Sequence, residues 1–114
     1  MNNKRLDEIY ELIKKTGYIQ SLNIYREMSY KSAKEYNLVL VISTCPNYEE
    51  DEKVKLIFHN VQEFKLGNIN NFYKVFFEIL DVSDRQLEDI RYYVHEIEYN
   101  MISFWCSDIE YEIF

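Results

Sequence analysis

Glycine and proline are scarce in this sequence, which has two glycines and one proline among its 114 residues. A phosphate-binding loop needs closely spaced glycines, and a flexible linker needs glycine, serine or proline in quantity, so we expect neither. Hydrophobic residues make up 47% of the chain and charged residues 29%, which is typical of a folded domain rather than a disordered segment. The length suits one hydrophobic core, and we expect a single domain over residues 1–114.

Long apolar runs are also missing. The longest strictly aliphatic run, residues 38–42, is far shorter than the roughly 20 residues that cross a bilayer. No apolar stretch follows the basic pair near the N-terminus, so no signal peptide is expected. We therefore expect a cytoplasmic protein with no membrane partner, in which the two cysteines, Cys45 and Cys106, stay reduced.

Positive charge is in deficit. Thirteen basic residues against 20 acidic ones give a net charge of −7, which repels phosphate backbones, so nucleic acid is not expected as a partner. Residues 75–114 carry two arginines and ten acidic residues, a balance of −8. Aromatic side chains are interleaved with these charges, a combination typical of a protein-binding surface that attracts a basic partner. They are Tyr92, Tyr93, Tyr99, Trp105 and Tyr111.

Apolar spacing predicts an N-terminal helix followed by strands. Leu6, Ile9, Tyr10 and Ile13 form one stripe of a helix over residues 3–15, and Gly17 suits its end. The connections that follow are too short for helical crossovers, so the strands are expected to be mostly antiparallel. The fold class is therefore α+β, an N-terminal helix packed on a mostly antiparallel β-sheet of about six strands. The predicted strands are residues 18–28, 36–44, 53–59, 72–82, 91–99 and 101–113.

Three local features refine this prediction. Residues 36–44 are apolar on both faces, which indicates a central strand. The alternation slips at Asn60, where we expect a bulge. Ser83 and Gln86 have the spacing of a capping box at the start of a short helical turn.

The last two strands are expected to form a hairpin with a two-residue turn at 100–101. This turn pairs residues whose numbers sum to 201, so that Arg91 lies opposite Glu110 and apolar residues face apolar ones. The same register places His95 opposite Cys106, with Asp108 two positions along the same face.

A cysteine, a histidine and a carboxylate on one face have the chemistry of a nucleophilic site or of three metal ligands. No glycine-rich oxyanion loop accompanies them, and no paired cysteine or histidine motif supplies a fourth ligand. We therefore expect no catalytic residues, no metal and no cofactor. A small enzyme or ligand-binding domain that uses His95 and Cys106 is the alternative, and a subunit that self-associates through an exposed strand edge is another.

The favoured interpretation is a non-catalytic protein-binding domain whose binding residues lie on the final hairpin. Carboxylates alternate along these strands, with aromatic side chains between them. The expected partner-binding residues are Glu96, Glu98, Tyr99, Trp105, Asp108, Glu110, Tyr111 and Glu112.

Several stretches of the C-terminal two thirds resemble a known group of proteins. The stretches are residues 54–64 and 72–82, the segment Asp81-Val82-Ser83-Asp84-Arg85-Gln86-Leu87-Glu88, then Tyr92-Tyr93-Val94 and Ile102-Ser103-Phe104-Trp105-Cys106-Ser107-Asp108-Ile109-Glu110. In pattern they resemble small β-rich immunity proteins of bacterial polymorphic or contact-dependent toxin systems. The resemblance supplies no catalytic residue. It implies a cytosolic protein that binds and neutralises a cognate toxin, often a basic nuclease, by masking its active site.

Overall fold

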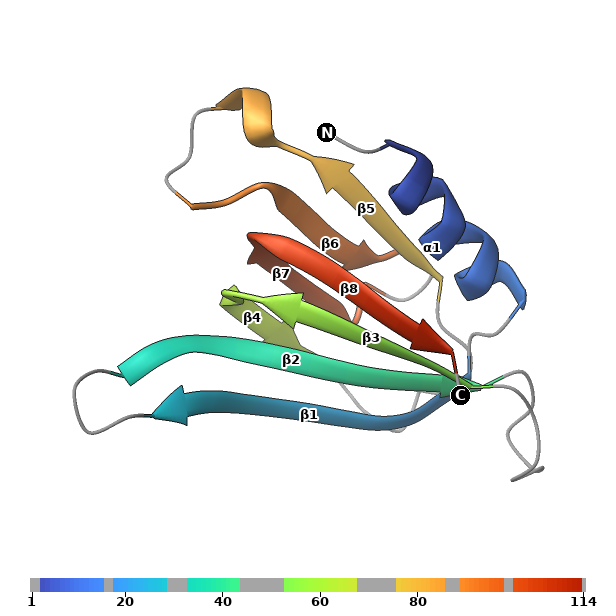
Figure 1. Ribbon diagram of the computed structural model, residues 1–114, viewed down its shortest axis with the longest axis horizontal. Coiled ribbons are helices and arrows are strands. Elements are labelled where there is room, and N and C mark those ends of the chain that lie inside the picture. The colour runs from blue at the N-terminus through green and yellow to red at the C-terminus, as the bar shows by residue number, and fades with distance from the viewer. Residues whose placement is uncertain are drawn as a thin grey trace.

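The computed structural model describes residues 3–15, 18–28, 33–43, 53–67, 76–85, 89–97 and 100–113. The strands form two four-stranded antiparallel sheets, a first sheet in the order β1-β2-β3-β8 and a second in the order β4-β7-β6-β5 (Figure 1). The α+β prediction is confirmed. The elements are α1 (Asn3–Lys15), β1 (Tyr18–Met28), β2 (Ala33–Ser43), β3 (Lys53–His59), β4 (Gln62–Leu66), β5 (Phe77–Asp81), the 3-10 turn η2 (Ser83–Arg85), β6 (Tyr92–Glu96), β7 (Ile102–Cys106) and β8 (Asp108–Ile113).

The two sheets are joined by a pair of strands that bend together. β3 runs on into β4, and β7 runs on into β8, with one or two residues between the members of each pair. His59 lies opposite Asp108 on one side of the bend and Gln62 opposite Trp105 on the other, so the offset between the two strands is unchanged. At the bend itself the Ser107 N–H donates to the His59 carbonyl oxygen at 2.9 Å. Six extended segments therefore supply eight strands, and the predicted count of about six matches the segments.

Asn60 makes the corner. Its φ of 56° lies in the left-handed region, which asparagine tolerates better than most residues. Its N–H donates to Asn37 Oδ1 at 3.2 Å, and its side-chain amide donates to the Asp89 carbonyl oxygen at 3.3 Å. The slip in the alternation at Asn60 therefore marks the change of sheet, and the bulge predicted there lies further on, at Glu63 in β4.

The inner faces of the two sheets enclose the core. Every second residue of β3 is buried, as the alternation predicted. Phe58 of β3 packs edge to face against Phe104 of β7, with ring centroids 4.9 Å apart and an interplanar angle of 77°. This contact joins the first sheet to the second. β2 lies between β1 and β3, which confirms the prediction of a central strand there.

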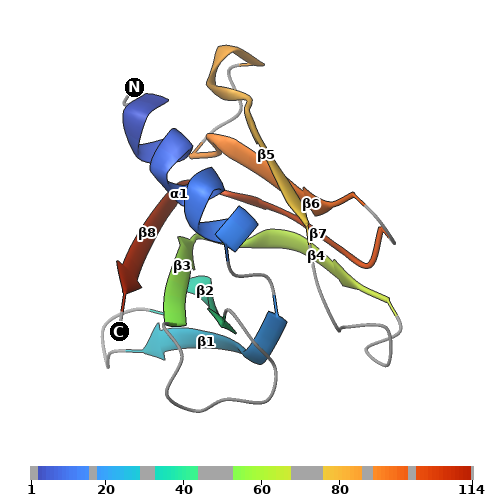
Figure 2. The ribbon, with the colours of Figure 1, turned by 90° about the vertical axis from the view of Figure 1, so that its right-hand side faces the viewer.

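Helix α1 lies between β8, an edge strand of the first sheet, and β5, an edge strand of the second (Figure 2). The predicted apolar stripe is confirmed, because Ile9 and Ile13 are buried and Leu6 and Tyr10 are half-buried against the core. Within the described part of the chain, no helix is long and apolar enough to cross a membrane.

Two tyrosines attach the helix to both sheets. The Tyr10 hydroxyl donates to the Ile79 carbonyl oxygen at 2.9 Å and accepts the Ile79 N–H at 2.6 Å, and burial raises the pKa of this hydroxyl. Because β5 is the last strand of the second sheet, Tyr10 covers its outer edge. On the other side, the Tyr111 hydroxyl of β8 donates to Glu8 Oε2 at 2.6 Å.

The final hairpin forms, but its predicted register is wrong. Tyr92 lies opposite Cys106 and His95 opposite Ser103, three positions away from the predicted partners. Five residues rather than two join β6 to β7, and the chain then bends, so that Glu110 pairs with Ile57 of β3 instead of with Arg91. A shift by an odd number of residues exchanges the two faces of a strand, which changes what each side chain meets.

The side chain of Asp81, at the end of β5, caps the 3-10 turn that follows. Both the N–H and the hydroxyl of Ser83 donate to Asp81 Oδ1, at 2.9 and 2.6 Å, and these bonds lower the pKa of the Asp81 carboxyl. The predicted helical turn is present as the 3-10 turn η2, whereas Gln86, Gly17 and residues 72–75 lie outside the described residues.

Replacing Tyr10 with phenylalanine should destabilise the protein. Tyr10→Phe removes the only hydroxyl that bonds to the Ile79 backbone among the described residues, and a buried peptide group left unpaired costs about 1–3 kcal/mol. We expect this loss in the free energy of unfolding measured by urea denaturation. Tyr36→Phe, at an exposed side chain, is the matched control and should change stability by less than about 0.5 kcal/mol. Equal stability of both variants would contradict this role for Tyr10.

Candidate protein-binding surface

The structure separates the residues of the alternative catalytic site. Cys106 is a free cysteine buried on the core side of β7, and burial, aided by the negative charge of Asp108, raises the pKa of its thiol to about 12. His95 lies on the outer face of the neighbouring strand, with its Nε2 2.8 Å from Glu78 Oε1. The alternative site at His95 and Cys106 is therefore wrong, because the observed register puts the two side chains on opposite faces. The described ranges contain no group of three His, Cys, Asp or Glu that could hold a metal ion.

The eight predicted partner-binding residues do not share one surface. Glu96 is completely buried, so the expectation that it faces solvent is wrong: it sits at a core-facing position of β6. Glu98 and Tyr99 lie outside the described residues. Tyr111 is half-buried and its hydroxyl is held by Glu8 of the helix. The remaining four lie on outer faces, with Trp105 on the second sheet and Asp108, Glu110 and Glu112 on the first.

Asp108, Glu110 and Glu112 form what we call the carboxylate row. They occupy every second position of β8, the last strand of the first sheet, so their side chains leave the same face. Across the ladder, Asp108 lies opposite His59 and Glu112 lies opposite Lys55. His59 Nε2 is 3.1 Å from Glu110 Oε2. Lys55 therefore offsets part of the negative charge of the row, and the His59 ring contacts Glu110 beside it.

The outer face of the second sheet carries apolar and aromatic side chains on both sides of a polar row formed by Glu78, His95 and Ser103. Three of its large side chains, Phe76, Leu80 and Ile97, are 38%, 39% and 49% exposed. The Tyr93 ring stacks on His95, with centroids 5.4 Å apart at 22°, and its centroid is 4.6 Å from that of Trp105. Large apolar side chains that gather exposed on one face are typical of interaction sites. We call this surface the aromatic face, and it consists of Phe76, Leu80, Tyr93, His95, Ile97 and Trp105.

Apolar and aromatic residues that are far apart in the sequence meet on this face. Leu80 lies opposite Tyr93, and Tyr93 opposite Trp105, so three strands contribute to one row across the sheet. Residues 76–80 and 92–97 each alternate in the structure between inner and outer positions. Both faces of these segments carry apolar side chains, however, and the period of two alone does not say which set is inside.

The aromatic face and the carboxylate row meet at the bend. Trp105 and Asp108 are three residues apart, which limits their backbone separation to about 10 Å. Ser107 lies between them at the corner. The outer surface therefore passes from aromatic to acidic within a short distance.

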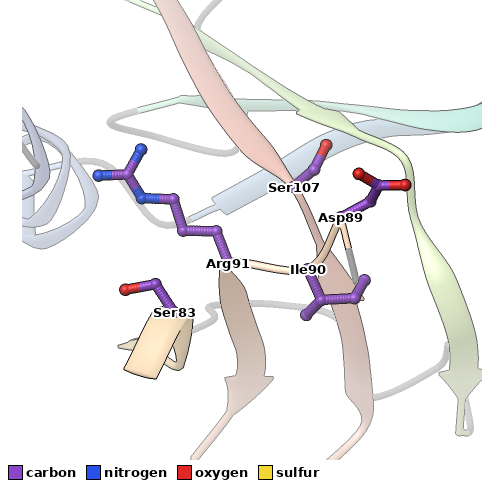
Figure 3. A pocket seen from close by; sticks show the side chains of 5 residues that line it. All are labelled: Ser83, Asp89, Ile90, Arg91 and Ser107. Atoms are coloured by element: carbon purple, nitrogen blue, oxygen red, sulfur yellow. The ribbon is translucent and has the colours of Figure 1, made fainter. Parts of the chain in front are cut away.

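A depression of about 420 Å³ lies beside this corner, near the start of β6 (Figure 3). Its lining offers one guanidinium, one carboxylate and two hydroxyls, and the side chains of Arg91 and Asp89 diverge rather than converge on a common point. Arg91 Nε is buried and has no hydrogen-bond partner in the structure, while its guanidinium carbon lies 5.4 Å from the Tyr92 ring centroid. Small-molecule sites place several polar groups toward one ligand, and this lining does not. The lining residues are Ser83, Asp89, Ile90, Arg91 and Ser107.

The described residues therefore form a small helix-and-sheet domain in which the Cys106 and His95 side chains lie on opposite faces and the outer faces carry acidic and aromatic groups. A family model described as "Immunity protein PIM8" matches residues 1–112, and the chain belongs to this family. The predicted resemblance to immunity proteins is thereby confirmed. The protein is non-catalytic, and its partner is a cognate toxin that it neutralises. No curated protein and no solved structure matches the chain.

The buried thiol has a direct chemical test. Because the thiolate is the reactive form and the pKa of Cys106 is raised to about 12, iodoacetamide should alkylate Cys106 on the order of 1,000-fold more slowly than a free thiol near pH 8. Peptide mass mapping measures the alkylation of Cys106 separately from that of Cys45. Unfolding in urea is the control and should restore the rate of a free thiol. Rapid alkylation of the folded protein would contradict the burial of this side chain.

Proposed function

We propose that this immunity protein neutralises its toxin by stoichiometric binding through an acidic and aromatic part of its outer surface. The observation that carries the proposal is the carboxylate row, which stands on a strand at the edge of a sheet beside the Trp105 end of the aromatic face. Glu110 and Glu112 are exposed, so a partner can reach them without rearrangement of the sheet. Bound there, the protein covers the toxin's functional groove.

The proposal includes a basic toxin. The chain carries a net charge of −7, and the row adds three carboxylates within five residues of one strand. Opposite charge on the partner accelerates encounter and disfavours wrong partners, whereas a second acidic protein would be repelled. A toxin that acts on nucleic acid presents a cationic groove of this kind to its substrate.

We place this encounter in the cytoplasm. The free, buried thiol of Cys106 is in keeping with a reducing compartment, in which thiols of intracellular proteins stay unpaired.

Protection of living cells tests the function itself. The gene for this chain is deleted from its source strain, and the deletion strain is grown together with unmodified siblings that make the toxin. We expect the deletion strain to be outcompeted and the chain supplied from a plasmid to restore growth. A deletion strain that grows as well as its siblings would refute neutralisation of a toxin.

Charge reversal in the row tests its role in association. Glu110→Lys should slow binding to the purified toxin by a factor on the order of ten at low salt and make the rate less dependent on salt, because the steering field is weakened. Stopped-flow or surface-based kinetics measures this rate. The matched control is Glu11→Lys, which makes the same change of charge at an exposed position of helix α1.

The control separates local from overall charge. A rate that falls equally in both variants would show that only the net charge of the chain matters. Unchanged kinetics in Glu110→Lys would remove the row from the proposed surface.

A further inference from the structure

The aromatic face is more apolar than a solvated sheet surface requires. Leu80 and Ile97 point outward at 39% and 49% exposure, and Phe76 stands beside Ile97, whose N–H donates to the Phe76 carbonyl oxygen at 2.9 Å. In an antiparallel sheet with one solvated face, polar residues occupy these outward positions. Here β5 and β6 also present large apolar side chains beside the outward Glu78 and His95, which is a cost to solubility that a binding role explains.

The aromatic face is also rigid. Tyr93 lies on β6, which pairs with β5 on one side and with β7 on the other, so its backbone is held from both sides. Its ring also contacts the rings of His95 and Trp105. Side chains that are already ordered lose little conformational entropy when they bind, and tyrosine and tryptophan in such positions dominate many interfaces.

One carboxylate is set into this apolar surface. Glu78 lies opposite His95, with Oε1 2.8 Å from His95 Nε2, and its side chain is 46% exposed. A partner that covered Glu78 with apolar groups alone would desolvate a charge, which is costly unless a cation comes with it. An arginine is the best match, because its guanidinium stacks on aromatic rings and pairs with a carboxylate at the same time.

We infer that the aromatic face is the anchor for the toxin, and that the toxin presents to it an arginine surrounded by apolar side chains. The guanidinium stacks on Tyr93 and Trp105 and pairs with Glu78, while the apolar side chains cover Leu80 and Ile97. The inference rests on the proposed function and names the partner chemistry within it. It also agrees with the net charge of −7, which favours a cationic partner over a second copy of the chain.

The aromatic face and the carboxylate row then have different effects on binding. Charges at the row, partly offset by Lys55, act at a distance and set the rate of association. Apolar and stacking contacts act only when the surfaces touch, so their loss accelerates dissociation. Each contribution can be removed without the other.

The test uses the plasmid-borne chain in the deletion strain, challenged by toxin-producing siblings. Ile97→Lys places a charge in the anchor and should abolish protection, with dissociation from the purified toxin faster by a factor on the order of 30 or more. The matched control is Ile113→Lys, which puts the same residue at a 52% exposed isoleucine of β8 in the first sheet. We expect Ile113→Lys to protect. Equal melting temperatures of the two variants exclude a folding defect.

A second measurement identifies what touches the anchor. A photo-crosslinking amino acid, p-benzoylphenylalanine, replaces Ile97 in one variant and Ile113 in another, and both are illuminated in complex with the toxin. We expect a crosslink from position 97 to a toxin peptide that contains arginine. In the same complex, Glu78→Gln should weaken affinity about tenfold, since it removes the charge that meets the guanidinium.

Three results would overturn the inference. If Ile97→Lys protects as well as the wild-type chain, the aromatic face is not the anchor. If the free protein is a dimer that Ile97→Lys converts to monomers, the occupant is a second copy. If position 97 crosslinks to a toxin peptide without arginine and Glu78→Gln binds normally, the partner chemistry is wrong. Failure of the wild-type chain to protect would instead refute the proposed function, so the two failures are distinguishable.

Discussion

The structure depends on one bend, made by two neighbouring strands at the same place. β3 and β8 continue as β4 and β7 with their register unchanged, and the Ser107 N–H to His59 carbonyl bond keeps the ladder intact at the turn. The left-handed conformation of Asn60 allows the change of direction. Because of this bend, the six extended segments form two sheets whose inner faces pack against each other. Phe58 of the first sheet contacts Phe104 of the second. Without it the inner faces would have no partner.

The bend also determines what the outside of the molecule can do. Helix α1 packs between the edge strands β5 and β8, where Tyr10 bonds to Ile79 of β5 and Tyr111 of β8 bonds to Glu8 of the helix. The inner faces of the two sheets and the helix therefore form the core. The outer faces of the two sheets stay accessible. There the first sheet presents the carboxylate row and the second presents the aromatic face, with Trp105 and Asp108 on either side of the corner. In the proposed mode of binding, the row supplies long-range attraction and the adjoining aromatic face supplies short-range contact.

Much of the fold could be predicted because local patterns were strong. The helix stripe, the alternation of β3 and the doubly apolar β2 all follow from spacing within one segment. The hairpin register and the site could not be predicted in the same way. A two-residue turn was assumed where five residues join β6 to β7, and the error of three positions exchanged the faces, so Glu96 was expected outside and Cys106 beside His95. Trp105, Asp108, Glu110 and Glu112 of the predicted set lie on outer faces, whereas the exposed side chains of Phe76, Leu80 and Ile97 were not predicted.

The sequence by itself determined the fold class, the extended segments, the acidic character and the lack of a recognisable catalytic motif. Each of these depends on composition or on neighbours along the chain. Tertiary structure decided which apolar residues are core and which are surface. In the second sheet, both faces of β5 and β6 carry apolar side chains, and only the packing of the inner face into the core leaves Tyr93 and Ile97 outside. That choice is a property of the bend, which brings together strands far apart in the chain, and no local pattern encodes it.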